Sequence, residues 1–222
     1  MTWTIPNILT VGRLLAAPAF ALVFVLLPRP VADIGALVLF VLAALTDYLD
    51  GYLARKWNQI TAFGRMLDPI ADKAMVIIAL AVLIGLSGLN PLVVIPATVI
   101  LFREVFVSGL REYLGADAGR LSVTKLAKWK TTVQMVAIVA LLLTSIFQMQ
   151  IEAIYYASDP AQFDAILQGT AEDTLGLVAL SQRYDFVLWL GLSLIWLSGG
   201  LTLITGIDYF AKALPHLAQT KE

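Results

Sequence analysis

The chain has 222 residues, of which 59% are hydrophobic and only 14% are charged, and its mean hydropathy is +0.84. An ordinary soluble domain carries about 25% charged residues, so this composition excludes that class and indicates a membrane protein. The net charge of −1 identifies no partner, because the placement of cations matters more than their sum in such a protein. Cysteine is absent, which excludes disulfides, thiolate metal sites and a cysteine nucleophile.

Apolar segments long enough to cross the hydrocarbon core follow one another along the chain. One of them, residues 74–102, is too long for a single comfortable span, and the breakers in "GLSGLNP" (85–91) predict a tight turn inside it. We therefore predict an all-α integral membrane protein with six transmembrane helices. Their apolar parts cover residues 8–27, 31–46, 74–85, 91–113, 131–149 and 186–210.

No repeat, low-complexity tract or linker divides the sequence, so we predict one membrane-embedded domain over residues 1–222. Residues 1–7 include Trp3 and Pro6, which suit an interfacial N-terminus. The polar residues 150–185 predict an external segment that forms a short helical or irregular cap.

The lysines and arginines predict the orientation, because short cytoplasmic loops are enriched in them. If both termini are cytoplasmic, thirteen of the fifteen cations fall on that side, and only Arg29 and Arg183 fall outside. The thirteen are Arg13, Arg55, Lys56, Arg65, Lys73, Arg103, Arg111, Arg120, Lys125, Lys128, Lys130, Lys212 and Lys221. The charged stretch between the second and third helices then faces the cytoplasm.

That stretch, "DYLDGYLARKWNQITAFGRMLDPIADK" (residues 47–73), holds four aspartates. Asp47 and Asp50 are three residues apart, and Asp68 and Asp72 are four apart, so on helices each pair shares a face. Two such pairs on adjacent helices can converge, and crowded carboxylates then need a cation among them to stay ionised. Oxygen ligands without His or Cys select a hard ion such as Mg²⁺, Mn²⁺ or Ca²⁺.

A solvated loop that carries positive-inside cations is the alternative interpretation of the same stretch. Scattered loop charges would not place every aspartate on a helical repeat, so the spacing favours a site.

The small residues of the stretch lead to further expectations. Gly51 lacks a Cβ atom and would let a bulky ligand approach the helix, while Arg55, one turn later, offers a planar fork for a phosphate. Gly64 would permit a turn between two helices. Asp68 before Pro69 predicts an N-cap with proline at the first helical position, unless the helix starts earlier and contains Pro69.

Eight fixed positions of the stretch resemble the signature of the CDP-alcohol phosphatidyltransferase family. The match is Asp47-x2-Asp50-Gly51-x2-Ala54-Arg55-x8-Gly64-x3-Asp68-x3-Asp72. The resemblance implies the six-helix fold of that family and a catalytic domain, usually homodimeric, in which the hydroxyl of an alcohol displaces CMP from a CDP-linked lipid.

The resemblance also implies roles for individual residues. One or two divalent cations, Mg²⁺ or Mn²⁺, would be held by Asp47, Asp50, Asp68 and Asp72. Asp72 would in addition be the general base that deprotonates the acceptor hydroxyl. The CDP-linked lipid would contact Asp47, Gly51, Ala54 and Arg55.

Three further stretches are similar to the family members that join CDP-diacylglycerol to sn-glycerol 3-phosphate. They are "IPNILTVGRLLAAPAF", "REVFVSGLREYLG" from Arg103, and "KWKTTVQM" from Lys128. The chain departs from these members at Ala127, where a glycine is expected, and in the length of residues 150–185. These departures bear on acceptor fit and outer packing rather than on the reaction type.

Cations near the fourth and fifth helices suit a phosphate-bearing acceptor. Arg103 and Arg111 are eight residues apart, close to one helical face, and Lys128 and Lys130 open the next helix. Guanidinium and ammonium groups bind the dianionic phosphate of glycerol 3-phosphate well. Alternatively, these cations satisfy only the positive-inside rule, or Arg103 pairs with a carboxylate inside the bundle.

Other functions are compatible with the same residues. Within the family, the acceptor could be inositol phosphate, serine or phosphatidylglycerol. A divalent cation transporter could also carry acidic residues in a helical bundle, although it needs no clamp for a nucleotide diphosphate. A non-catalytic membrane scaffold is the third alternative. We expect membrane lipids as partners, no nucleic acid, and the cytoplasmic membrane of a bacterium as the location.

Overall fold

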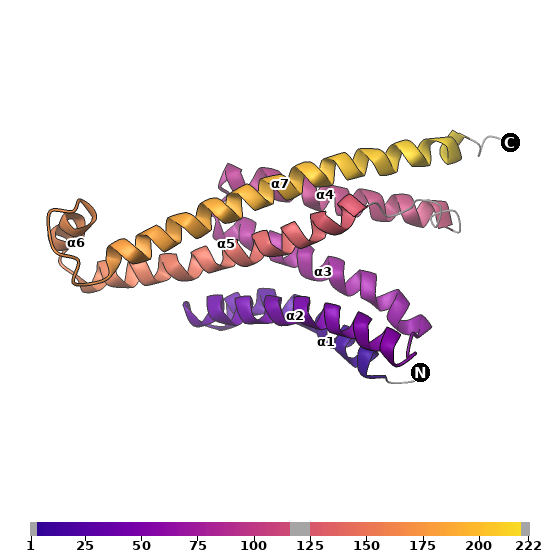
Figure 1. The fold of residues 1–222 in the computed structure, drawn as a ribbon, viewed down its shortest axis with the longest axis horizontal. Helices are drawn as coiled ribbons and strands as arrows, with labels where there is room; N and C mark the ends of the chain where they lie inside the picture. Colours follow the sequence, from indigo (N-terminus) through magenta and orange to yellow (C-terminus); the bar gives the residue numbers. More distant parts are fainter. Residues whose placement is uncertain (1–3, 116–124, 219–222) are drawn as a thin grey trace.

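The computed structural model describes residues 4–115 and 125–218, and within these ranges it contains helices and no strand (Figure 1). Six of the helices are long and apolar enough to cross a membrane, while the short α6 is not. The all-α, six-span class is therefore confirmed. The elements in chain order are α1 (Ile5–Leu26), α2 (Val31–Lys56), α3 (Ala62–Leu86), α4 (Pro91–Leu114), α5 (Lys125–Ala157), α6 (Pro160–Leu167) and α7 (Leu177–Ala218).

The first helix begins earlier than its apolar run. Thr4 is the N-cap of α1, and its hydroxyl accepts a hydrogen bond from the Asn7 amide at 3.4 Å. Pro6 lies in the first turn, where its missing N–H costs nothing. Residues 5–7 of the predicted interfacial segment thus belong to α1, and residues 1–3 lie outside the described residues.

The charged stretch is helical almost throughout, because α2 continues to Lys56 and α3 starts at Ala62. Thr61 caps α3 by accepting the Gly64 amide at 3.0 Å. The predicted N-cap at Asp68 is therefore wrong, and the alternative of an earlier start is correct, with Pro69 inside the helix. The predicted turn at Gly64 is also wrong, since Gly64 lies in the first turn of α3.

The break inside residues 74–102 is confirmed. α3 ends at Leu86, and the chain passes through Gly88 and Leu89, which have positive φ angles of 60° and 64°. Asn90 then caps α4, since its side chain accepts the Leu92 amide at 3.0 Å. Gly88 adopts its positive φ angle without strain because it has no Cβ atom.

Helices α5 and α7 lie side by side and run on beyond the rest of the bundle (Figure 1). α5 has 33 residues and is about 50 Å long, which exceeds the bilayer core. Residues 150–157 and 177–185 of the predicted external segment therefore continue these two helices, and residues 158–176 form a cap that contains α6. Asp173 starts α7 by accepting the amides of Leu177 and Val178 at 2.9 and 3.0 Å.

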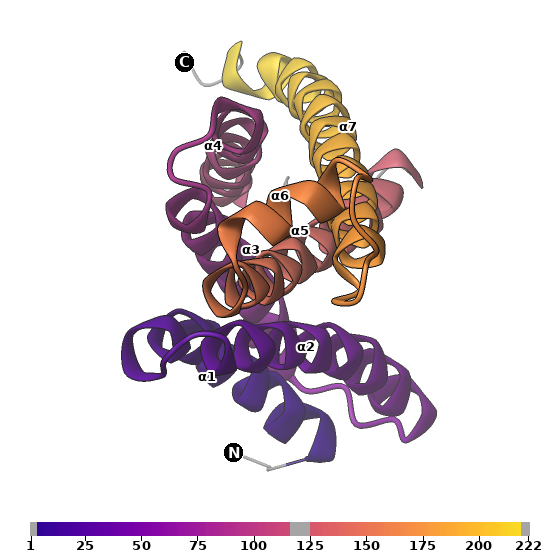
Figure 2. The same cartoon turned by 90° about the vertical axis from the view of Figure 1, so that its left-hand side faces the viewer.

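The bundle has three layers when it is viewed end-on (Figure 2): α1 with α2, then α3 with α5, then α4 with α7. α1 packs closely against both α2 and α3, whereas α2 and α3 have little contact with each other. The core that joins the layers contains fully buried Phe20, Phe40, Leu80, Ile100 and Ile138. Both termini and the α2–α3 turn lie at one end, and α6 lies at the other (Figure 1).

This arrangement predicts that the α2–α3 turn and the α6 cap lie on opposite sides of the membrane. The protein has no cysteine, so single cysteines can be labelled without background. In oriented vesicles, we expect a membrane-impermeant maleimide to modify Lys56→Cys and Ala171→Cys from opposite sides. Labelling of both variants from the same side would contradict the six-span topology.

Candidate active site

The four aspartates of α2 and α3 converge on a single cation, Arg13 of α1. One terminal nitrogen of the guanidinium, Nη1, contacts the carboxylates of Asp47 and Asp72. The other, Nη2, lies 2.8 Å from Asp50 Oδ2 and 4.0 Å from Asp68 Oδ1. The convergence predicted from the two helical spacings is thus observed, and each nitrogen faces one aspartate from each helix.

Thr10 extends this contact by one helical turn. Its hydroxyl lies 2.8 Å from Asp68 Oδ1 and 3.2 Å from Asp50 Oδ2. The side chains of Arg13 and Asp50 are only 2% and 5% exposed, whereas those of the other three aspartates are 45–48% exposed. The site therefore has a closed floor formed by α1 and an open side lined by carboxylates.

A small pocket beside the aspartates is lined by Asp50, Asp68, Gly51 and Ala54, together with residues at the start of α1. Gly64 forms its back, where a Cβ atom would lie 2.9 Å from the side-chain oxygen of Asn7. Glycine is needed here so that α1 and α3 can approach each other.

Arg55 of α2 lies beside Gly51, one of the residues that line this pocket. Its guanidinium lies 3.6 Å from the position that a Cβ atom of Gly51 would occupy. The guanidinium therefore lies over the open backbone that we expected a ligand to approach.

A second cavity, of about 280 Å³, lies on the other side of the guanidinium. Asp47, Asp72 and Arg13 line it together with Thr131 and Thr132 of α5. Asp50 and Asp68 thus line the first pocket, and Asp47 and Asp72 line the second. The guanidinium of Arg13 lies between these two sets of carboxylates.

The donor set fits a hard divalent cation, because all four side chains offer carboxylate oxygens and three are half exposed. In the described part of the chain, no three acidic side chains already form a metal-binding cluster. The positive charge among them is the guanidinium of Arg13. Metal binding by these residues remains a prediction.

The cations expected to bind the acceptor lie on α4 and α5. Lys130 Nζ is 2.5 Å from Glu104 Oε1, and Arg103 Nη1 is 3.1 Å from the same atom. The alternative that Arg103 pairs with a carboxylate inside the bundle is therefore observed. The side chain of Lys128 lies outside the described residues.

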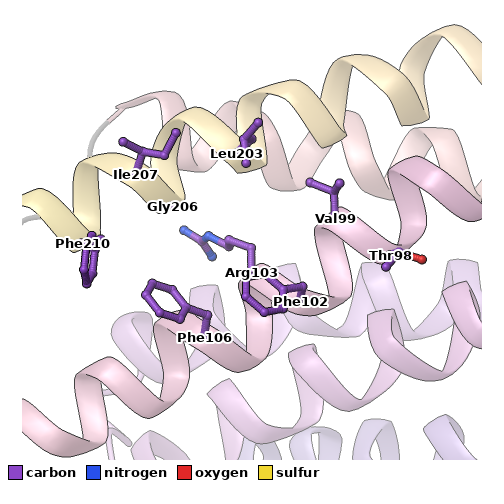
Figure 3. A pocket seen from close by; sticks show the side chains of 9 residues that line it. All are labelled: Thr98, Val99, Phe102, Arg103, Phe106, Leu203, Gly206, Ile207 and Phe210. Atoms are coloured by element: carbon purple, nitrogen blue, oxygen red, sulfur yellow. The ribbon is translucent and has the colours of Figure 1, made fainter.

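Arg103 and Arg111 also meet at Tyr209 of α7. Their guanidinium carbons lie 5.5 and 5.3 Å from the centre of its ring, and Arg111 Nη2 donates to its hydroxyl at 3.1 Å. Arg103 points from α4 toward Gly206 within a cavity of about 420 Å³ between α4 and α7 (Figure 3). The sequence placed these two arginines on one face, and the structure brings them to one ring.

One contact links this region to the aspartates. Lys73, next to Asp72 on α3, lies with its Nζ 2.6 Å from Ser108 Oγ on α4. The expected acceptor cations and the carboxylates thus belong to adjoining parts of the bundle.

Sequence reasoning missed the contribution of α1 to the site. Asn7, Thr10 and Arg13 recur every three residues, which places them on one polar stripe of an otherwise apolar span. An arginine inside a span is costly and marks a functional position, so Arg13 offered a usable signal. Glu104 and Tyr209 offered only a weaker signal in the sequence.

A model of the CDP-alcohol phosphatidyltransferase family matches residues 3–160, which include α1, the four aspartates and the α4 cations. The chain belongs to the CDP-alcohol phosphatidyltransferase family. It is a multi-pass membrane protein, and residues 47–73 join two of its spans.

Several relatives share a single name, CDP-diacylglycerol–glycerol-3-phosphate 3-phosphatidyltransferase. The protein of that name from Cereibacter sphaeroides is 54% identical over 221 residues and covers 100% of both chains. One from Pseudomonas fluorescens is 38% identical over 96% of this chain and 91% of its own length. One from Rickettsia bellii is 37% identical over 93% of each chain.

The ion pair of Glu104 and Lys130 predicts a strong coupling in stability. We expect Glu104→Gln to lower Tm by about 10 °C, because breaking a buried pair costs about 3–5 kcal/mol. Lys130→Met should also lower Tm, and the double variant should lose clearly less than the sum of the two, since it leaves no buried charge from this pair. Thermal unfolding in detergent measures all three.

The exposed pair of Asp208 and Lys212 on α7 is the matched control. Both side chains are at least 40% exposed, so Asp208→Asn should shift Tm by about 1 °C or less. Strictly additive losses in the Glu104 and Lys130 variants would contradict the buried pair.

Proposed function

We propose that this protein transfers the phosphatidyl group from CDP-diacylglycerol to sn-glycerol 3-phosphate, forming phosphatidylglycerophosphate and CMP. The observation that carries the proposal is the convergence of the four signature aspartates on one site. The shared name of relatives that match over nearly the whole chain supports the choice of substrates.

We propose further that Asp47, Asp50, Asp68 and Asp72 bind one or two divalent cations, Mg²⁺ or Mn²⁺. Their oxygen donors and half-exposed carboxylates support this assignment. When bound, such an ion would neutralise the charge of the substrate diphosphate. Gly51 and Ala54 would line the cytidine diphosphate site, with Arg55 positioned to contact a phosphate.

In the proposed reaction, Asp72 accepts the proton of the primary hydroxyl of glycerol 3-phosphate. The hydroxyl oxygen then bonds to the phosphorus of the phosphatidyl group, and the bond from that phosphorus to the bridging diphosphate oxygen breaks. CMP leaves with the bridging oxygen. Asp72 suits this role because its side chain is 47% exposed and lines the cavity of about 280 Å³ beside α5.

The acceptor phosphate is assigned to Arg103, Arg111, Lys128 and Lys130. Arg103 and Arg111 support this assignment because both lie over one tyrosine ring. Glu104 holds Arg103 and Lys130 in place, and its single charge leaves the cluster net positive. A positive cluster near the cavity of Asp72 would orient the hydroxyl end of the acceptor toward the carboxylate.

The proposed location is the cytoplasmic membrane of a bacterium, with both termini and the site on the cytoplasmic side. The distribution of lysines and arginines supports this orientation, and the two termini lie at the same end of the bundle (Figure 1). Glycerol 3-phosphate would then arrive from water while the acyl chains stay in the bilayer. The family resemblance extends the proposal to a homodimer.

The proposed activity predicts that purified protein releases CMP from CDP-diacylglycerol only when both glycerol 3-phosphate and Mg²⁺ or Mn²⁺ are present. Chelation with EDTA should reduce the rate at least about 100-fold, because the diphosphate charge is then unbalanced. Serine, inositol phosphate and phosphatidylglycerol serve as alternative acceptors in the same assay. Faster CMP release with one of these would reassign the acceptor, and activity unchanged in EDTA would contradict the metal site.

The assignment of Asp72 predicts a loss of turnover without a loss of the lipid substrate site. Asp72→Asn should lower kcat about 1,000-fold, as expected for a missing general base. Its binding of CDP-diacylglycerol, measured by protection against thermal unfolding, should persist. Asp208→Asn, a half-exposed aspartate on α7 outside the site, is the control. A kcat within about threefold of wild type would rule out Asp72 as the base.

A further inference from the structure

The two acidic helices of the site do not hold each other in place. α2 and α3 carry two aspartates each but have little mutual contact, whereas α1 packs closely against both. The groups of α1 that reach the carboxylates are the hydroxyl of Thr10 and the guanidinium of Arg13. The relative position of the two aspartate pairs therefore depends on α1.

The charges of the site make Arg13 the more important of these two contacts. Four carboxylates held this close together repel one another, and one guanidinium offsets part of that repulsion. Arg13 in turn needs the carboxylates, since its side chain is 2% exposed inside a membrane span. Loss of Arg13 leaves the repulsion among the carboxylates unbalanced, and loss of the carboxylates leaves Arg13 as a buried, unpaired charge.

The guanidinium is suited to joining the two helices. Nη1 contacts Asp47 of α2 and Asp72 of α3, while Nη2 faces Asp50 of α2 and Asp68 of α3. Each nitrogen therefore links the two helices, and the planar group fixes the spacing between the pairs. A point charge such as the ammonium of lysine lacks this geometry.

We infer that Arg13 is a positioning residue: it is the internal counter-ion that keeps the four aspartates assembled when no metal is bound. The inference rests on the metal site of the proposed function. Arg13 supplies positive charge on the buried side of the aspartates, and a bound divalent cation would supply positive charge on their exposed side. Loss of Arg13 should therefore matter most in the metal-free protein.

The test compares thermal unfolding of purified wild type and Arg13→Gln in EDTA and in millimolar Mn²⁺. We expect Arg13→Gln to lower Tm by about 10 °C in EDTA and by less than half of that in Mn²⁺. The same variant should bind Mn²⁺ about tenfold more tightly in a paramagnetic-resonance titration, because a neighbouring positive charge is gone.

Arg29→Gln is the matched control, because Arg29 makes a second ion pair with a buried aspartate far from the proposed metal site. Its Nε lies 2.8 Å from Oδ2 of Asp33, which is 1% exposed. This variant should lose the same amount of Tm in EDTA as in Mn²⁺. A loss in Arg13→Gln that is equally independent of Mn²⁺, while wild type responds to the ion, would overturn the inference.

A double-variant cycle in EDTA separates failure of this inference from failure of the metal site. A wild-type Tm that does not respond to Mn²⁺ would contradict the metal site, and the cycle alone would then decide the role of Arg13. Arg13→Gln should cost less than half as much Tm in an Asp50→Asn background, because one repelling carboxylate has been removed. Equal losses in both backgrounds would overturn the role of Arg13.

Discussion

The structure depends on one electrostatic constraint: four carboxylates brought this close together at one end of a membrane bundle need a cation among them to stay ionised. The guanidinium of Arg13 meets this constraint, and it comes from a helix outside the signature stretch. The packing of α1 against α2 and α3 is therefore part of the site. Gly64 belongs to the same arrangement, since any side chain there would press on Asn7 of α1.

The same constraint governs the other ionisable groups within the spans. Glu104 of α4 pairs with its neighbour Arg103 and with Lys130 of α5. Asp33 of α2 accepts hydrogen bonds from Arg29 and from Ser145 of α5, the latter at 2.7 Å. A different register of α4 and α5 would separate the buried Lys130 from Glu104, at a cost well above that of imperfect apolar contact. Polar contacts thus align helices that apolar packing alone allows to slide.

Hydropathy and helix spacing predicted most of the fold and the convergence of the aspartates, because both follow from local sequence. The errors arose at helix ends, whose positions depend on capping residues rather than on hydropathy. Thr61, not Asp68, starts α3, since its hydroxyl meets the Gly64 amide before the apolar run begins. Hydropathy did not predict the outer ends of α5 and α7, which lie within the polar residues 150–185. A helix that extends beyond the bilayer can carry polar residues on its surface, so it gives no continuous apolar signal. The cap at Asp173 was equally invisible to hydropathy.

The partners of the site could not be predicted in the same way, because they come from helices far apart in the sequence. Asp50 and Thr10 are 40 residues apart, and Arg111 and Tyr209 are 98 apart. The signature stretch supplies the acids, and α1 decides how they face one another. Three of these acids remain half exposed although Arg13 is buried, so the contact that assembles them leaves their outer surfaces open to ligands from the water side. A fully enclosed set of ion pairs would be as well satisfied electrostatically, but it would leave no carboxylate available for chemistry.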